Sequence, residues 1–241
     1  MDIGSLSSKY FETSLGRLHY LEHAPGGGPA ILFIHGFAGS VKSWTRLVRL
    51  MPEGFGIYLL DLLGHGDSDA PDADYSFKMH YDSVREFIEG IGLSRYYVFG
   101  HSYGGWIAAY HAMEARIEGL VLEDSAGLEE FMEERAMQNP HYREEMVDRA
   151  LQINPRKNVL SRMINADNGD YFLTPAGLGE IESRTLVIWG EIDTTVNPKY
   201  SGVFARSIPK ARLEVVPGAR HTPHYTDPKA VAELLLGFMH I

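Results

Sequence analysis

The chain has 241 residues, a formal net charge of −10 at pH 7 and no cysteine. This length allows one large α/β domain with an inserted subdomain. The negative charge argues against binding to nucleic acids or anionic membranes through bulk electrostatics. The lack of cysteine excludes disulfides, thiol nucleophiles and cysteine-ligated metals.

No segment resembles a targeting or membrane element. The first five residues contain no basic segment followed by an apolar run, and no stretch approaches the roughly 20 apolar residues of a membrane span. We expect a cytoplasmic protein that binds neither a membrane nor a nucleic acid and that is a monomer or a homodimer.

Strand-like and helix-like segments alternate along most of the chain, which predicts a mostly parallel sheet with helices on both faces. A surface turn is expected at residues 25–29 and a long loop at 61–71. The predicted strands are residues 10–13, 17–23, 30–34, 57–60, 96–99, 119–122, 185–189 and 212–216. The predicted helices are residues 41–51, 77–91, 105–112 and 228–239, the last of them capped by Asp227.

Residues 125–183 break this alternation. The segment contains no clear buried strand, and its apolar residues have helical spacing, as in Leu128, Phe131 and Met132. We interpret it as an inserted helical cap of two to four helices, with residues 1–124 and 184–241 forming the α/β core. The alternative is two long connecting helices that do not cover a site.

The most informative motif is Gly100-His101-Ser102-Tyr103-Gly104, which lies between a predicted strand and a predicted helix. Gly-x-Ser-x-Gly in this context is typical of a nucleophile elbow, a turn so sharp that side chains at the two glycines would collide with the backbone. Ser102 would then stand at a helix N-terminus, where free N–H groups favour negative charge.

A serine hydroxyl needs a base to take its proton and a carboxylate to orient that base. His221 follows the predicted strand 212–216 and precedes the last helix, so it would lie at the same sheet edge as Ser102; His224 is its rival. Asp193, in the loop after strand 185–189, is the first candidate for the carboxylate. Asp124, which follows strand 119–122, is the second.

The negative oxygen of a tetrahedral intermediate needs two N–H donors. The backbone N–H of Tyr103, directly after the candidate nucleophile, is one candidate. We assign the other to Phe37, in the loop His35-Gly36-Phe37 after strand 30–34. Aromatic residues near the motifs suggest a hydrophobic acyl pocket, although core packing would also explain them (Phe37, Trp44, Tyr103 and Trp106).

Together these segments resemble the α/β-hydrolase fold serine hydrolases. The matching motifs are His35-Gly36-Phe37, the run from Asp61 to Ser68, the Ser102 motif with Gly105, Trp189-Gly190-Glu191-Ile192-Asp193 and Gly218-Ala219-Arg220-His221. The resemblance implies an eight-stranded, mostly parallel sheet, flanked by helices, with a cap over the active site. It also implies that His35 and the loop 64–68 are structural.

The resemblance does not determine the substrate, because this fold supports many reactions. We expect a carboxylesterase without metal or cofactor that hydrolyses small-molecule esters of short to medium acyl chains through Ser102, His221 and Asp193. The alternatives are a carbon–carbon bond hydrolase or an acyltransferase with the same triad, and a ligand-binding protein of low turnover. The chain lacks the His-Gly-Gly-Gly and Gly-x-Gly-Pro-Gly forms of the oxyanion loop.

Overall fold

The structure is a computed structural model that describes residues 3–23, 29–138 and 141–239. Within these residues, eight strands form one sheet in the order β1-β2-β4-β3-β5-β6-β7-β8. Their bounds are β1 (Ser7–Thr13), β2 (Gly16–His23), β3 (Ala30–Ile34), β4 (Gly56–Leu60), β5 (Tyr96–His101), β6 (Gly119–Glu123), β7 (Thr185–Gly190) and β8 (Ala211–Val216). The β1–β2 and β2–β4 pairs are antiparallel and all other pairs are parallel. The predicted mostly parallel, eight-stranded sheet is therefore confirmed.

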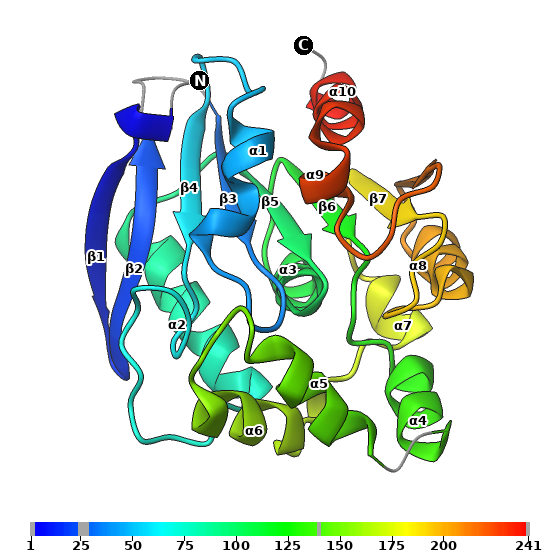
Figure 1. The fold of residues 1–241 in the computed structure, drawn as a ribbon. Helices are drawn as coiled ribbons and strands as arrows, with labels where there is room; N and C mark the ends of the chain where they lie inside the picture. The colour runs from blue at the N-terminus through cyan, green and yellow to red at the C-terminus, as the bar shows by residue number, and fades with distance from the viewer. Residues whose placement is uncertain (1–2, 24–28, 139–140, 240–241) are drawn as a thin grey trace.

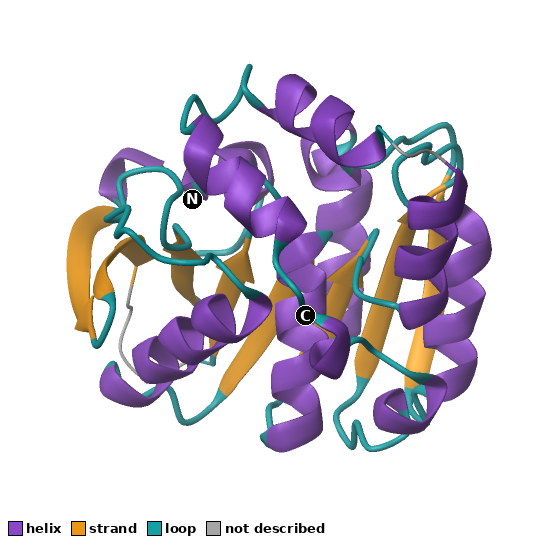
Figure 2. Cartoon of the chain, turned by 90° about the horizontal axis from the view of Figure 1, so that it is seen from below, coloured by secondary structure: helices purple, strands orange, loops and turns teal. Residues whose placement is uncertain are grey.

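Helices cover both faces of the sheet (Figure 2). The helices α2 (Phe77–Gly90), α3 (Tyr103–Glu114) and α8 (Ser201–Ser207) bury apolar side chains on one face. The other face packs against the 3₁₀ helix η2 (Val41–Trp44), α1 (Thr45–Val48) and α10 (Pro228–Met239). The central strands β3, β6 and β7 are buried along their whole length, which explains their continuous apolar sequences.

Four α-helices and one 3₁₀ helix lie between β6 and β7 in the described residues. They are α4 (Glu129–Gln138), α5 (Tyr142–Ala150), α6 (Lys157–Asn165), η3 (Gly169–Tyr171) and α7 (Pro175–Leu178). In Figure 1, α4, α5 and α6 lie below the ends of the strands, on the side to which the arrows of β4, β5 and β6 point. These helices are thus placed at the carboxyl edge of the sheet. The division into a core and a cap at residues 125–183 stays a prediction.

Some local predictions differ from the structure. Strand β1 starts at Ser7 rather than at residue 10, because its exposed, polar first residues pair with β2 without any apolar alternation to mark them. The single helix predicted for 41–51 is η2 followed by the short α1. Helix α1 ends at Val48 because the N–H groups of Leu50 and Met51 bond to the carbonyls three residues earlier, which is the pattern of a 3₁₀ turn. Of the turn predicted at 25–29, all but Pro29 lies outside the described residues.

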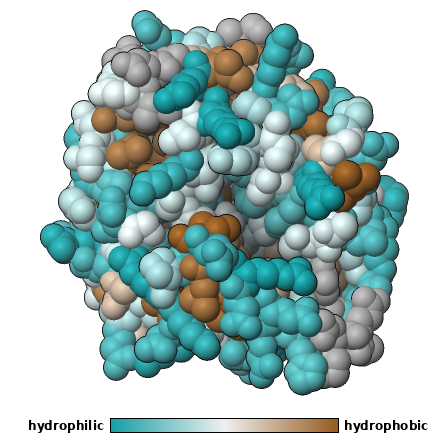
Figure 3. Space-filling view, in the orientation of Figure 1, coloured by the Kyte–Doolittle hydropathy of each residue, from teal (hydrophilic) through white to brown (hydrophobic). Residues whose placement is uncertain are grey.

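The remaining short elements are η1 (Ile3–Ser5), η4 (Pro198–Tyr200) and α9 (Pro223–Thr226). The side chain of Asp227 accepts the N–H of Ala230 and caps α10, as predicted. Within the described residues, no helix is long and apolar enough to cross a membrane. The face in Figure 3 is mostly hydrophilic, and its apolar side chains form small patches.

Several histidines are buried in the core as neutral rings. Burial lowers the pKa of His80 to about 4 and that of His111 to about 4. The ring of His80 contacts the Tyr103 hydroxyl and the Leu63 carbonyl, at 3.0 and 3.1 Å. The His111 Nε2 atom lies 2.8 Å from the Tyr96 hydroxyl. Neutral histidines can make these contacts without an ion-pair partner. Protonation of the buried rings in acid would destabilise the folded state.

We therefore expect stability to fall in mild acid. The unfolded chain binds protons at these two histidines near pH 6.5, whereas the folded chain does so only near pH 4. Each histidine should therefore lower the free energy of unfolding by about 2 kcal/mol when the pH falls from 7 to 5. Urea unfolding at a series of pH values measures this slope. His111→Gln should make the slope shallower, and an unfolding free energy that is constant from pH 7 to pH 5 would contradict the prediction.

Candidate active site

The turn between β5 and α3 has the geometry of a nucleophile elbow. Ser102 has φ 51° and ψ −114°, a backbone conformation that residues other than glycine rarely adopt. Its N–H donates to the carbonyl of Glu123, and its carbonyl accepts the N–H groups of Trp106 and Ala126. The strained serine is therefore held between β6 and the first turn of α3, with only 8% of its surface exposed.

The glycines of the motif are required by close backbone contacts. A Cβ atom on Gly100 would lie 2.3 Å from the carbonyl oxygen of Gly104. On Gly104 it would lie 2.1 Å from the carbonyl oxygen of Ile34, and on Gly105 2.6 Å from the Ser125 hydroxyl. All three distances are shorter than any van der Waals contact. The glycines thus let α3 approach the ends of β3 and β6.

Gly104→Ala tests this packing. Because the clash is with backbone on two sides, we expect the substitution to lower the unfolding free energy by more than about 2 kcal/mol. Gly237→Ala is the matched control, since a Cβ there meets nothing within 4 Å and alanine favours the helix α10. Thermal unfolding of both variants measures the difference, and equal stabilities would show that the elbow tolerates a side chain.

The structure brings Ser102, His221 and Asp193 together in one chain of hydrogen bonds. The His221 Nδ1 atom lies 2.8 Å from Asp193 Oδ2, and its Nε2 atom lies 2.9 Å from Ser102 Oγ. A carboxylate only accepts hydrogen bonds, so Nδ1 carries the proton and Nε2 is free to accept the serine proton. The other oxygen of Asp193 accepts the N–H groups of Thr195 and Val196, at 2.7 and 3.1 Å, which fixes the carboxylate.

The two rival residues bond to other partners. His224 is buried, and its Nδ1 atom and backbone N–H both contact the Glu123 carboxylate. Its ring packs on Trp44, with 4.4 Å between ring centroids. Asp124 accepts the N–H of Gly190 at 2.9 Å. Neither residue replaces His221 as the partner of Ser102 or Asp193 as the partner of His221.

The two proposed oxyanion donors lie beside Ser102. Phe37 and Tyr103 line the same cavity as Ser102, and a Cβ on Gly36 would lie 3.0 Å from the Ser102 Cβ. In the described part of the chain, the N–H groups of Phe37 and Tyr103 have no hydrogen-bond acceptor. Tyr103 is also the first residue of α3, whose N-terminus favours negative charge. The loop from His35 and the elbow therefore offer two free donors next to the hydroxyl.

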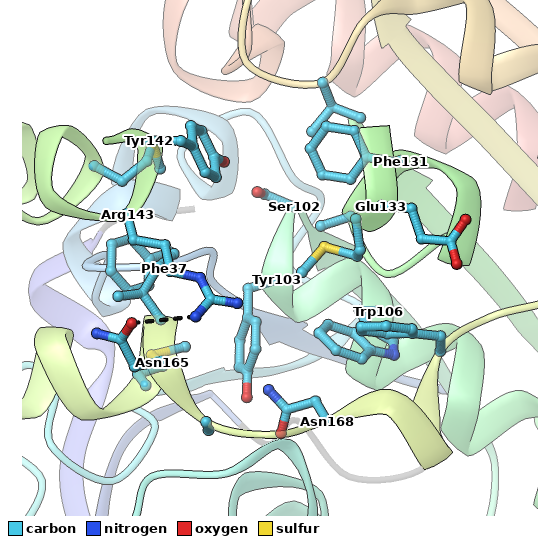
Figure 4. A pocket seen from close by; sticks show the side chains of 18 of the residues that line it. Phe37, Ser102, Tyr103, Trp106, Phe131, Glu133, Tyr142, Arg143, Asn165 and Asn168 are labelled. Atoms are coloured by element: carbon cyan, nitrogen blue, oxygen red, sulfur yellow. Dashed lines mark hydrogen bonds between the residues drawn. The ribbon is translucent and has the colours of Figure 1, made fainter. Parts of the chain in front are cut away.

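The cavity at Ser102 has a volume of about 690 Å³ and is lined by both apolar and polar side chains. Figure 4 shows Phe131 and Trp106 on one side of Ser102, and Tyr142, Arg143 and Asn165 on the other. Phe37 and Tyr103 line the cavity too, so three of the four predicted aromatic residues border it. The fourth, Trp44, does not, because it is fully buried against the other face of the sheet.

A second cavity, of about 760 Å³, lies between η2 and the connection from α5 to α6. Its lining includes Lys42, Arg46 and Arg156 but none of the three residues Ser102, His221 and Asp193. Although it is slightly larger than the first cavity, it holds no nucleophile with a base. We therefore place the candidate active site in the cavity at Ser102.

Clusters of histidines and carboxylates lie next to the triad, but hydrogen bonds already occupy most of their ring nitrogens and carboxylate oxygens. Both ring nitrogens of His221 are bonded, the Nε2 atom of His101 contacts the His221 carbonyl, and both oxygens of Glu123 contact His224. A metal ion at these groups would displace the contacts that align the triad. We therefore assign no metal to this site.

Two residues of the loop motifs, His35 and Asp61, bond to backbone groups, and a structural role was expected for His35. The His35 Nε2 atom accepts the Leu62 N–H at 3.1 Å, and burial lowers the pKa of His35, so the ring is neutral. Asp61 accepts the N–H groups of Val41 and Asp67, at 2.7 and 3.0 Å. These bonds hold the loops after β3 and β4 together beneath the oxyanion donors.

Sequence reasoning missed the role of His101. Its Nε2 atom lies 2.6 Å from the His221 carbonyl oxygen and must donate to it, which anchors the loop that carries His221. Its place directly before Ser102 was the only signal in the sequence. Arg143 of α5 and Asn165 of α6, which line the cavity, were also missed, because nothing in the helical pattern of this segment marks them.

Comparisons with known proteins agree with this fold. The model of the alpha/beta hydrolase family matches residues 31–234. Lipase 1 of Psychrobacter immobilis is 27% identical over 243 residues, covering 86% of this chain and 75% of the lipase. A hydrolase from Pseudomonas aeruginosa PA01 is 25% identical, with a TM-score of 0.75 and complete coverage of both chains. The 2-hydroxy-6-oxo-6-phenylhexa-2,4-dienoate hydrolase from Rhodococcus sp. strain RHA1 has a TM-score of 0.80 at 19% identity, covering 98% of this chain and 99% of that one. Since the family model covers most of the sequence, the chain belongs to the alpha/beta hydrolase family.

Proposed function

We propose that this protein is a serine carboxylesterase that hydrolyses small esters of short to medium acyl chains. The observation that carries the proposal is the aligned chain Ser102–His221–Asp193, with bonds of 2.9 and 2.8 Å. An activated serine beside two free N–H groups is the arrangement that acyl transfer requires. The name of the relative from Psychrobacter immobilis, Lipase 1, supports ester hydrolysis.

The geometry gives each group a step in the reaction. Ser102 Oγ attacks the ester carbonyl carbon while its proton passes to His221 Nε2. The N–H groups of Phe37 and Tyr103 stabilise the oxyanion of the tetrahedral intermediate. His221 then returns the proton to the leaving alcohol as its C–O bond breaks, which leaves an acyl-enzyme on Ser102.

Deacylation repeats these steps with water. His221 takes a proton from a water molecule, whose oxygen attacks the acyl carbon, and then protonates Ser102 as the acid leaves. Asp193 holds the imidazole in the correct tautomer and stabilises its cation throughout. Every step uses side chains and backbone groups of this chain.

The shape of the cavity supports an apolar acyl group of limited length. Much of its lining consists of aromatic and methionine side chains (Trp106, Phe131, Met132, Met163 and Phe172). A volume of about 690 Å³ is within the range of small-molecule sites. We therefore infer that acetyl to octanoyl groups are preferred to long acyl chains.

One observation favours a second candidate function, the hydrolysis of a carbon–carbon bond in an anionic substrate. The Arg143 guanidinium reaches into the cavity and bonds to the neutral Asn165 Oδ1 at 3.3 Å (Figure 4). Within the described residues it forms no ion pair with a carboxylate. It would therefore be available to a carboxylate of the substrate. Glu133 also lines the cavity, but in Figure 4 its carboxylate points away from Arg143.

A substrate panel separates these candidates. We expect rapid release of p-nitrophenol from the acetate, butyrate and octanoate esters and slow release from the palmitate ester. A mass increase equal to the acyl group, located on Ser102 after an acid quench, would show the acyl-enzyme. Turnover of a vinylogous diketone with negligible ester hydrolysis would support the second candidate. Labelling by a fluorophosphonate without any turnover would support an acyltransferase or a binding protein.

A further inference from the structure

A second buried carboxyl group lies beside the triad, at Asp124. This residue directly follows β6 and has a left-handed backbone with φ 45°. Its own N–H donates to the Ile188 carbonyl at 3.0 Å, and its Oδ1 atom accepts the Gly190 N–H at 2.9 Å. These two bonds tie Asp124 to the end of β7, and its side chain is fully buried.

The Oδ2 atom of Asp124 has no hydrogen-bond partner among the described residues. A carboxylate oxygen of Asp124 and ring nitrogens of His101 and His221 lie within 4.8 Å of one another. However, His221 uses both nitrogens for Asp193 and Ser102, and His101 uses Nε2 for the His221 carbonyl. Burial holds the pKa of His101 well below its usual range, so its ring is neutral and Nδ1 has no proton to give. Thus no neighbouring histidine supplies a proton to Oδ2.

The charges around Asp124 also oppose its ionisation. Burial, the negative charge of Glu123 and that of Asp193 all raise the pKa of Asp124 well above its usual range, and the Asp193 carboxylate raises it further as an acceptor for a proton on Asp124. Asp193 differs because its oxygens accept three hydrogen bonds, from Thr195, Val196 and His221. When two carboxyl groups share one site, one of the two pKa values rises strongly, and the group whose charged form accepts more hydrogen bonds keeps the charge.

We propose that Asp124 is a positioning residue of the triad: its carboxyl group is neutral at pH 7 and donates the Oδ2 proton to the Asp193 carboxylate. The pair then carries one negative charge, located on Asp193 under His221. The bond gives the buried Oδ2 of Asp124 its missing partner and gives Asp193 a fourth donor. This proposal rests on the proposed function only in that it assumes His221 acts as the base.

The variant Asp124→Asn tests the charge of Asp124, because asparagine keeps its shape, its neutrality and a donor. The surrounding titratable groups are Glu123 on β6, His101 on β5, Asp193 after β7, and His221 and His224 after β8. Asp124→Asn leaves these groups unchanged. In the pH profile of kcat/KM, we therefore expect the acidic limb, which reports protonation of the base His221, to move by less than about 0.3 pH units in this variant. If Asp124 were ionised, its removal would lower that pKa by more than about one unit, since opposite charges so close favour the cationic ring.

A pair of variants tests the hydrogen bond itself. Asp124→Ala removes the donor, and we expect kcat to fall by about 10- to 100-fold with little change in KM, because Asp193 loses a bond to its charged form. Asp124→Asn should restore kcat to near the original value. If both variants lost kcat equally, the donor role would be wrong.

A measurement without substrate separates this proposal from the proposed function. A protonated carboxylic acid has a C=O stretch distinct from that of a carboxylate, and the infrared spectrum of the protein at pH 7 should contain such a band. Asp124→Asn should remove it, and circular dichroism should show that this variant is folded. A protein with the band but without ester turnover would contradict only the esterase. Ester turnover without this infrared band, together with a shifted acidic limb in Asp124→Asn, would contradict only the proposal that Asp124 is neutral.

Discussion

Ser102→Ala should lower ester hydrolysis by roughly 10⁶-fold in kcat, to the level supported by the remaining site. The substitution removes the Oγ atom that lies 2.9 Å from His221 Nε2, so neither the acyl-enzyme nor the proton transfer to His221 can form. The free N–H groups and the cavity stay in place. Initial rates with p-nitrophenyl butyrate, corrected for the uncatalysed reaction, measure the effect.

The control for this variant is Ser125→Ala. Ser125 is also buried near α3, where its hydroxyl donates to the Ala126 carbonyl, but it does not line the cavity at Ser102. We expect its activity to stay within a few-fold of that of the unchanged protein. Both variants should show the same cooperative thermal unfolding. Ester hydrolysis that persists in Ser102→Ala would mean that another group is the nucleophile.

Asp193→Asn should lower kcat by about 10⁴-fold. An asparagine amide that replaces the carboxylate donates a hydrogen bond to the His221 Nδ1 atom and so stabilises the tautomer that carries its proton on Nε2. That ring can no longer accept the Ser102 proton, and the cation formed during reaction loses its stabilising charge. The acidic limb of the pH dependence of kcat, measured with the same ester, should also move to lower pH, because a negative charge beside the imidazole has been removed.

Glu191→Gln is the matched control for Asp193, since both acidic residues lie in the loop after β7. Glu191 accepts the Gly218 N–H at 2.8 Å and bonds to no residue of the triad, so we expect only a small change in rate. A rate for Asp193→Asn within tenfold of the original would show that another acid, with Asp124 as the first candidate, serves His221.

The central strands could be predicted from the sequence because burial on both faces requires continuous apolar runs. Strand β3 was predicted with its bounds, Ala30–Ile34. The first residues of β1 could not be predicted, because an exposed edge strand gains its hydrogen bonds from β2 without burying apolar side chains. The broken helix at 41–51 was also missed, since its apolar spacing fits a continuous helix and only the local hydrogen bonds show the tight turns.

The sequence by itself determined the elbow at Ser102, because the strand, the turn and the helix are contiguous and two glycines are obligatory where backbones nearly touch. It also limited the base and the acid to two candidates each. Only the tertiary structure chose between them: Ser102 and His221 are 119 residues apart, and Asp193 and His221 are 28 apart. Which side chains meet at a sheet edge depends on strand order and on loop paths. Local sequence also does not specify how many hydrogen-bond donors reach each buried carboxyl group. Among the described residues, Asp193 accepts three hydrogen bonds and Asp124 accepts one, and this difference distinguishes the two residues.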